Sequence, residues 1–398
     1  MAQKRWLAPW KDDPKRSTIY HVVNRVVDRR FMLGNEEKEK FRMFMRLAEN
    51  FSGCRVLSYC LMSNHFHLLL EVPPRVGRVE GIELPVDGDL GAKEVGGALQ
   101  NEGDEISEAT FFDRLRLLYS EPVVDELRAQ VAQARQRGHT EELRRLYARH
   151  TYRMHDLSEC MKTLTQRFSS WFNRSHDRKG RLWEQRFKSV VVEDGVACKT
   201  MAAYIDLNPV RAGMVNDPAE YRWSSYGEAV AGGKRARAGL ARAVGSSSGT
   251  AATELPGRDF DAKRLQRAWA QGGLAKRYRK ILLGEGIEKP ETKATAEGKV
   301  YEVRVARKGL KREVAEKELA ELESRESDLA IAQVIKHRVR YFSDGVAIGG
   351  KGFVNEFFAG NRRRFGEKRR SGARKPRGAL QALGDRIWSL RDLGVERC

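Results

Sequence analysis

Cysteine is scarce in this chain, and its pattern excludes two common ways of stabilising a small module. The 398 residues contain five cysteines, and none of them forms a C-x-x-C pair. An odd number without paired spacing predicts neither a disulfide framework nor a zinc ribbon. We therefore expect reduced thiols, as is usual in a cytoplasmic protein.

Long apolar runs and nucleotide-binding motifs are missing as well. No run approaches the roughly 20 apolar residues that span a bilayer, and the N-terminal sequence MAQKRWLAPWKDDPKR lacks the apolar core of a signal peptide. No G-x-x-x-x-G-K-[ST] motif occurs, and GVAIGGKG at 345–352 matches neither a P-loop nor a dinucleotide fingerprint. The sequence thus predicts a cytoplasmic protein with no membrane partner and no nucleotide cofactor.

Acidic residues are much fewer than basic residues in this chain. The chain has 74 Lys and Arg residues against 54 Asp and Glu residues, a net charge of +20. Such an excess favours a polyanionic partner, with nucleic acid preferred over an anionic membrane surface. Hydrophobic residues make up 41% of the chain, enough for a real core, and the length suggests two or three modules.

The most informative segment is LSYCLMSNHFHLLLEVPP at 57–74, an apolar stretch that contains His65 and His67. Side chains alternate between the two faces of a strand, so both histidines project to one face while Phe66 and Leu68 point towards a core. Two imidazoles on one rigid face suit a single divalent metal. Taken alone, the pair is explained equally well as polar residues on the solvated side of a half-buried strand.

The hydrophobic pattern predicts the element order βαββαβ, followed by one more helix. The strands are expected at 18–27, 54–62, 65–72 and 181–193, and the helices at 36–50, 156–175 and 196–208. The short turn Met62–Asn64 requires the second and third strands to pair antiparallel. This order predicts an α+β fold, a ferredoxin-like split βαβ antiparallel sheet with helices on one face and the other face free for a ligand.

Composition divides the chain into four parts. The α+β domain covers 1–74 and 151–230, and an acidic, then helical, insertion covers 75–150. Residues 231–258 read as a basic flexible linker, and 259–398 as a mainly helical basic region.

In that last region we expect helices at 260–283, 311–341 and 353–360, with 345–352 as a glycine turn. A helix, a glycine turn and a second helix can form a DNA-reading helix-turn-helix. Residues 362–377 add nine basic residues against Glu367. A solvated basic tail on a helical packing domain is the alternative.

A second informative segment is YIDLNPVRAGMV at 204–215. Tyr204 and Asn208 are four residues apart on the expected helix and therefore lie on one face. A core aromatic followed by a polar helix terminus before Pro209 would look the same.

Four segments together resemble a known family, the REP-associated tyrosine transposases of the single-tyrosine HUH class. They are YHVVNR at 20–25, LMSNHFHLLLEVP at 61–73, GRLWEQRFKSVVVED at 180–194, and YIDLNPVRAGMV with YRWSSY after it. The resemblance covers roughly residues 17–228 without the insertion. It implies a DNA transposase that cleaves and rejoins single-stranded or hairpin DNA at REP-like elements.

The resemblance also implies roles for individual residues. His65 and His67 would bind a divalent metal, Mg²⁺ or Mn²⁺, and Tyr204 would attack DNA to form a 5′-phosphotyrosine. Asn208 would be the third metal ligand, at a position where related insertion-sequence transposases usually have Gln. A protein with this role would be associated with the nucleoid.

Basic and aromatic residues flank the proposed site and are candidate DNA contacts, because cations neutralise phosphates and aromatic rings stack on unpaired bases. They are Arg25, Arg181, Trp183, Arg186, Lys188 and Arg211. Core packing is an equal alternative for Trp183, and a solvated charge is the alternative for Arg25. His21 is assigned a structural role.

Three functions remain open at this stage. The first is the transposase, the second a domesticated nucleic-acid-binding regulator on the same fold, and the third a metal-dependent phosphodiesterase that uses water. A nucleophilic role of Tyr204 separates the first from the others. The sequence leaves open whether the protein forms a homodimer.

Overall fold

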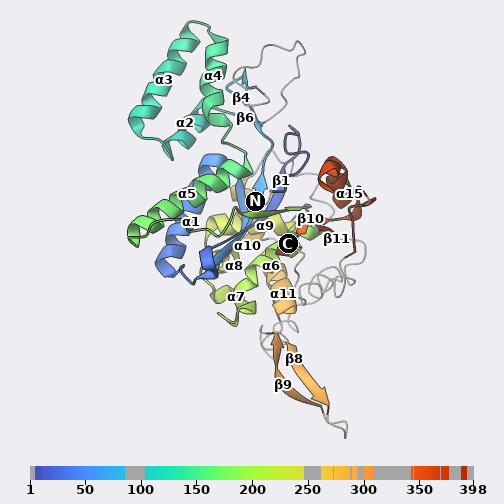
Figure 1. Ribbon diagram of the computed structural model, residues 1–398. Helices are drawn as coiled ribbons and strands as arrows, with labels where there is room; N and C mark the ends of the chain where they lie inside the picture. Colours follow the sequence, from blue (N-terminus) through green and yellow to red (C-terminus); the bar gives the residue numbers. More distant parts are fainter. Residues whose placement is uncertain are drawn as a thin grey trace.

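The computed structural model describes residues 5–85, 104–245, 261–271, 273–286, 289–294, 300–307, 342–343, 345–367, 369–375 and 387–391. Its centre is a six-stranded sheet in the order β11-β10-β7-β1-β3-β2 (Figure 1). The strands are β1 Thr18–Arg25, β2 Arg55–Leu61, β3 His65–Val72, β7 Lys188–Val192, β10 Gly345–Gly349 and β11 Trp388–Arg391.

Strand β1 lies in the middle of the sheet and pairs antiparallel with both β3 and β7. Strands β2 and β3 form the expected antiparallel hairpin around Met62–Asn64. Strand β10 runs parallel to β7, and β11 pairs antiparallel with β10. The α+β architecture is therefore confirmed, with a sheet that is mixed rather than purely antiparallel.

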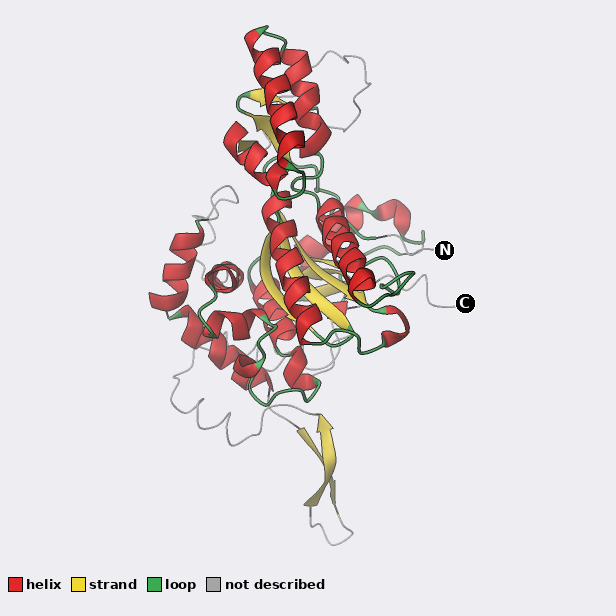
Figure 2. Ribbon diagram, turned by 90° about the vertical axis from the view of Figure 1, so that its left-hand side faces the viewer, coloured by secondary structure: helices red, strands yellow, loops and turns green. Residues whose placement is uncertain are grey.

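Helices cover both faces of this sheet, whereas we had expected helices on one face only (Figure 2). Helices α1 Asn35–Ser52 and α5 Leu157–Ser175 pack on the face that carries Phe66 and Leu68. Helices α6 Val196–Asp206, α8 Ser225–Val230 and α9 Lys234–Gly245 pack on the face that carries Leu69 and Val190. The alternation of apolar residues in the strands supplies both cores.

Helix α9 corrects the predicted linker at 231–258, of which residues 246–258 lie outside the described residues. The sequence KRARAGLARAVG is rich in alanine, a strong helix former, and its small residues allow a close approach to β2. A Cβ atom on Gly239 would lie 2.4 Å from the carbonyl oxygen of Val56. Small side chains that suggested a flexible segment are thus part of a buried helix.

The insertion forms a lobe with its own hydrophobic core, at the top of Figure 1. It begins with a three-stranded sheet, in which β4 lies between β5 and β6. Three helices follow and pack around Phe111 and Tyr147. Its elements are β4 Val76–Val79, β5 Ile82–Glu83, β6 Asp104–Ile106, α2 Glu108–Arg116, α3 Glu121–Gln136 and α4 Thr140–Thr151.

The C-terminal region contains helices, as expected, but it also completes the central sheet. The single helix predicted at 260–283 is two helices, α10 Ala262–Gln271 and α11 Leu274–Gly286, and a β hairpin of β8 Lys289–Ala294 and β9 Val300–Arg307 follows. The helix predicted at 311–341 lies outside the described residues. Helix α15 Lys351–Gly360 agrees with the prediction for 353–360.

The glycine turn predicted at 345–352 is wrong, because its first five residues form β10. Val346, Ala347 and Ile348 are buried in the sheet, next to β7. Gly349 lies so close to Glu193 that an added Cβ would be 2.5 Å from its side chain, and the Gly350 N–H donates to Glu193 Oε2 at 2.5 Å. The segment is therefore part of the α+β core, and strand β10 stands where the turn of the expected helix-turn-helix would be.

Candidate functional site

The two histidines of β3 share one face of the sheet with two basic residues. Residues that pair directly across neighbouring strands project to the same side. Arg25 pairs with His65, while Val23 pairs with His67 on one side and with Lys188 on the other. The His67 side chain is only 3% exposed, whereas Arg25 and Lys188 are exposed. The register thus creates a histidine site with cations at its open edge.

His67 is held by a third histidine from the neighbouring strand. His21 Nε2 lies 2.9 Å from His67 Nδ1, and the two ring planes are within 9° of parallel with centroids 5.2 Å apart. The other nitrogen of His21, Nδ1, lies 2.8 Å from the carbonyl oxygen of Phe342. His67 is therefore connected through His21 to the backbone carbonyl of Phe342, which is 321 positions after His21.

His65 is held by its neighbour in the hairpin turn. Its Nδ1 lies 2.6 Å from Asn64 Oδ1. The amide nitrogen of Asn64 donates in turn to the carbonyl oxygen of Arg29 at 3.0 Å. Both histidines of the pair thus use Nδ1 for a contact within the protein.

Burial keeps all three imidazoles in the neutral form. Desolvation, and then the charge of Arg25, lower the pKa of His65 to about 4. Desolvation, followed by His65 and His21, lowers the pKa of His67 well below its usual value. Desolvation lowers the pKa of His21 to about 4. A neutral imidazole has a free lone pair, which is the form that binds a metal.

Tyr204 lies on α6 above these histidines. Its ring centroid is 5.9 Å from that of His67 and 6.1 Å from that of His21. The ring also packs against Phe342 at 4.9 Å, and the guanidinium of Arg211 lies 4.4 Å from its centroid. The structure therefore brings Tyr204 next to His67, whose ring centroid is 5.1 Å from that of His65, although Tyr204 comes more than 130 positions after both histidines.

Asn208 begins the short helix α7 Asn208–Arg211, which follows α6 after a break before Pro209. Its Nδ2 donates to the carbonyl oxygens of Tyr204 at 3.1 Å and Ile205 at 3.2 Å. These side-chain contacts reach back to the last turn of α6, and the role of Asn208 as a third ligand remains a prediction. In the described ranges, no three His, Cys, Asp or Glu side chains cluster with the geometry of a metal site.

The predicted DNA contacts fall into two groups. Arg25, Lys188 and Arg211 lie at the histidine site. Arg181, Trp183 and Arg186 belong to the loop before β7, where Arg181 and Arg186 are exposed.

Trp183 packs on the opposite face of the sheet, with its ring centroid 5.4 Å from Phe66 and 5.8 Å from Phe168. Its indole nitrogen donates to the carbonyl oxygen of Thr165 at 3.4 Å. Of the two explanations considered for Trp183, this geometry favours core packing over stacking on a base.

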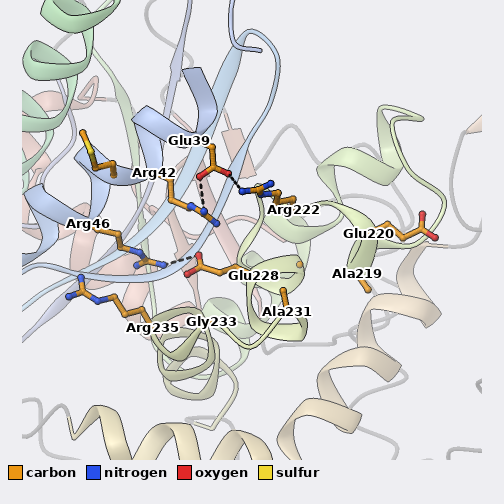
Figure 3. Close-up of a pocket in the computed structure, with 12 residues that line it drawn as sticks. Glu39, Arg42, Arg46, Ala219, Glu220, Arg222, Glu228, Ala231, Gly233 and Arg235 are labelled. Atoms are coloured by element: carbon orange, nitrogen blue, oxygen red, sulfur yellow. Dashed lines mark hydrogen bonds and ion pairs between the residues drawn. The ribbon is translucent and has the colours of Figure 1, made fainter. Parts of the chain in front are cut away.

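A separate surface pocket lies between α1 and residues 219–235 (Figure 3). Four arginines and three glutamates line it, and several of these charges pair with each other. Glu39 lies 2.7 Å from Arg42 and 2.9 Å from Arg222, and Glu228 lies 3.1 Å from Arg46. None of the predicted site residues lines this pocket, and its internal ion pairs give it a structural role.

Sequence reasoning missed His21 and Asn64 as parts of the site. His21 is two positions before Val23, so the alternation of β1 places it on the histidine face once β1 is paired with β3. The pairing was the missing information, because βαββ order alone does not determine the strand register. Nothing in the sequence indicated that the backbone carbonyl of Phe342 would lie beside His21.

Comparison with known proteins finds a similarity to one family over the first part of this domain. Residues 15–83 match the family of IS200-like transposases. This confirms the resemblance inferred from the sequence for the transposase-like segment, which contains β1, α1, β2 and β3 with both histidines. Tyr204 lies outside the matched residues.

One solved structure is similar to this chain, the REP-associated tyrosine transposase bound to a REP hairpin. It is 12% identical, with a TM-score of 0.29, and the match covers 58% of this chain and 86% of the other.

No curated protein matches the chain. In the described residues, no helix is long and apolar enough to cross a membrane.

Proposed function

We propose that this protein is a DNA transposase that cleaves and rejoins single-stranded DNA, with Tyr204 as the nucleophile. The observation that supports this most strongly is the placement of the Tyr204 ring beside the buried rings of His67 and His21, in a chain whose residues 15–83 match the IS200-like transposases. Hairpin DNA at REP-like elements is the proposed substrate, and a 5′-phosphotyrosine is the proposed intermediate.

The side chains at the site suit a divalent cation. His65 and His67 each use Nδ1 within the protein, which leaves Nε2 as the ligand atom. Asn208 is the proposed third ligand through its amide oxygen, because its amide nitrogen is turned towards helix carbonyls. Imidazole ligands favour Mn²⁺ over Mg²⁺ on affinity, while cellular abundance favours Mg²⁺.

When bound, Mg²⁺ or Mn²⁺ supplies positive charge to a nonbridging phosphate oxygen of the scissile bond. The basic residues of the site supply further positive charge along the DNA strand. Arg25 and Lys188 are exposed on the histidine face and can bind the phosphates on either side. Arg211 lies over the Tyr204 ring, where its charge favours the phenolate that develops during attack.

In the proposed reaction, Tyr204 Oη forms a bond to phosphorus and the bond from phosphorus to the 3′ oxygen breaks. The phenolic proton is lost to solvent and the leaving 3′ oxygen takes up one proton, so the reaction neither releases nor consumes protons overall. The phosphotyrosine retains the phosphodiester energy, so the reverse attack by a 3′-hydroxyl rejoins DNA without a nucleotide cofactor.

The deciding experiment is an adduct assay with Tyr204→Phe as the test variant. Wild-type protein, Mn²⁺ and single strands containing hairpins from the DNA flanking the gene should yield an SDS-resistant adduct. Tyr204→Phe should abolish the adduct and leave DNA affinity within about twofold, because only the nucleophilic oxygen is removed.

Other outcomes select the alternatives. Absence of an adduct with wild-type protein would contradict the transposase function, and binding without cleavage would favour a nucleic-acid-binding regulator. Cleavage that survives Tyr204→Phe would favour a phosphodiesterase that uses water.

A further inference from the structure

The hydrogen bonds around the two β3 histidines determine which nitrogen of each ring carries its proton. A backbone carbonyl can only accept a hydrogen bond. His21 Nδ1, 2.8 Å from the Phe342 carbonyl oxygen, must therefore carry a hydrogen. A neutral imidazole has one N–H, so Nε2 of the buried His21 is an acceptor.

The same reasoning continues to His67. His67 Nδ1 lies 2.9 Å from the acceptor Nε2 of His21 and must donate to it. The single hydrogen of neutral His67 is then on Nδ1, and its Nε2 carries a free lone pair. The Phe342 carbonyl thus determines the tautomer of His67 through His21.

An independent chain of contacts gives the same result for His65. The Asn64 amide nitrogen points to the Arg29 carbonyl oxygen at 3.0 Å, which places its oxygen towards His65. That oxygen accepts from His65 Nδ1 at 2.6 Å. His65 therefore also has its lone pair on Nε2. Two separate backbone carbonyls thus lead to the same tautomer in both rings.

We propose that His21 and Asn64 are positioning residues, which hold His67 and His65 in the tautomer that presents both Nε2 lone pairs to one divalent cation. This inference rests on the proposed function for the identity of the ligand. Metal-binding histidines are commonly oriented by a hydrogen bond to the second ring nitrogen, and loss of such a partner costs roughly 10 to 100-fold in metal affinity.

Two substitutions of His21 separate hydrogen bonding from filling of space. His21→Leu removes both hydrogen bonds, whereas His21→Gln keeps a donor for the Phe342 carbonyl and an acceptor for His67 Nδ1. Titration calorimetry of the full chain with Mn²⁺ alone should show affinity reduced roughly 10 to 100-fold in His21→Leu. His21→Gln should stay within about threefold of wild type, and Asn64→Ala should lose affinity as His21→Leu does.

Two results would overturn the proposal: His21→Leu binding Mn²⁺ as tightly as wild type, or His21→Gln binding as weakly as His21→Leu. Nitrogen-15 NMR of the imidazoles in wild-type protein without metal provides a readout that needs no variant. Both histidines should be protonated on Nδ1, and protonation of His67 on Nε2 would contradict the inference even if His21→Leu failed to fold. Wild-type protein that binds no Mn²⁺ would count against the proposed function, while the NMR tautomer would still decide the roles of His21 and Asn64.

Discussion

Asp206 shows how a single buried residue can anchor the helix that carries Tyr204, the proposed nucleophile. It lies two positions after Tyr204 and is fully buried. Its Oδ2 accepts from the hydroxyl of Tyr278 at 2.7 Å, and its Oδ1 accepts from the backbone N–H of Tyr226 at 3.0 Å. The carboxylate thus ties the end of α6 to α8 and α11.

This anchor should make stability depend on pH. Desolvation raises the pKa of Asp206 to about 7, against the opposing effect of its hydrogen bonds. A raised pKa in the folded state means that the stabilising contribution is complete below about pH 4 and is lost as pH rises to about 7. The loss amounts to about 1.4 kcal/mol per pH unit.

Asp206→Asn isolates this effect, because an amide can still accept from Tyr226 and donate to the Tyr278 hydroxyl. The free energy of unfolding, measured by urea denaturation at several pH values, should rise in the variant relative to wild type between pH 4 and 7. The comparison with wild type cancels the opposite pH dependence of the buried histidines. A difference that does not change with pH would show that Asp206 ionises normally.

At the scale of elements, the histidine hairpin and the tyrosine helix were predictable because each is encoded locally. Alternation along the strand predicted that His65 and His67 share one face of that strand. Helical spacing predicted that Tyr204 and Asn208 share one face of their helix. The contribution of 345–349 to the sheet was not predictable, because β10 pairs with a strand more than 150 positions away. The glycines of this segment are typical of a turn, but in the structure they leave room for the Glu193 side chain.

Helix α9 offers a test of close packing between elements. In Gly239→Ala the new Cβ would lie 2.4 Å from the carbonyl oxygen of Val56 and 2.9 Å from that of Leu57, so the backbone must move. We expect the free energy of unfolding in urea to fall by about 1–3 kcal/mol. Gly245→Ala is the matched control in the same helix, because its Cβ would meet nothing within 4 Å. Equal stability of the two variants would contradict the packing described here.

At the scale of the whole molecule, the residues before β1 pack against the segment of α15 and the residues that follow it. Trp6 stacks on Phe365 with ring centroids 5.0 Å apart, and the Arg364 guanidinium lies 3.6 Å from the Trp6 ring. Arg16 pairs with Glu356 at 2.5 Å. The C-terminal region is therefore integrated with the domain that carries the site, rather than being the separate module suggested by its composition.

The net charge of +20 should make DNA binding strongly dependent on salt. If the protein contacts 6–10 phosphates, affinity for single strands should fall by several orders of magnitude between 50 and 200 mM salt, because binding releases condensed counterions. Replacing Arg25 and Lys188 by Gln should reduce the slope of log affinity against log salt by about 1.4, roughly 0.7 for each lost phosphate contact. Fluorescence anisotropy with labelled oligonucleotides measures both.

The matched control replaces Arg145 and Arg149, which are exposed on α4 in the insertion lobe. This double variant removes the same charge away from the histidine face and should leave the slope close to that of wild type. A slope that falls equally in both double variants would assign DNA binding to overall charge rather than to Arg25 and Lys188.

The hydrogen bond between His21 and Phe342 also limits how early in protein synthesis the histidine site can form. The ribosome must add 321 residues after His21 before its carbonyl partner exists. At elongation rates of about 5–20 residues per second, this takes roughly 15–60 s. A nascent chain that has already produced Tyr204 therefore still lacks the carbonyl group that orients His67 through His21. We therefore expect the proposed DNA cleavage to begin only after residue 342 has been synthesised.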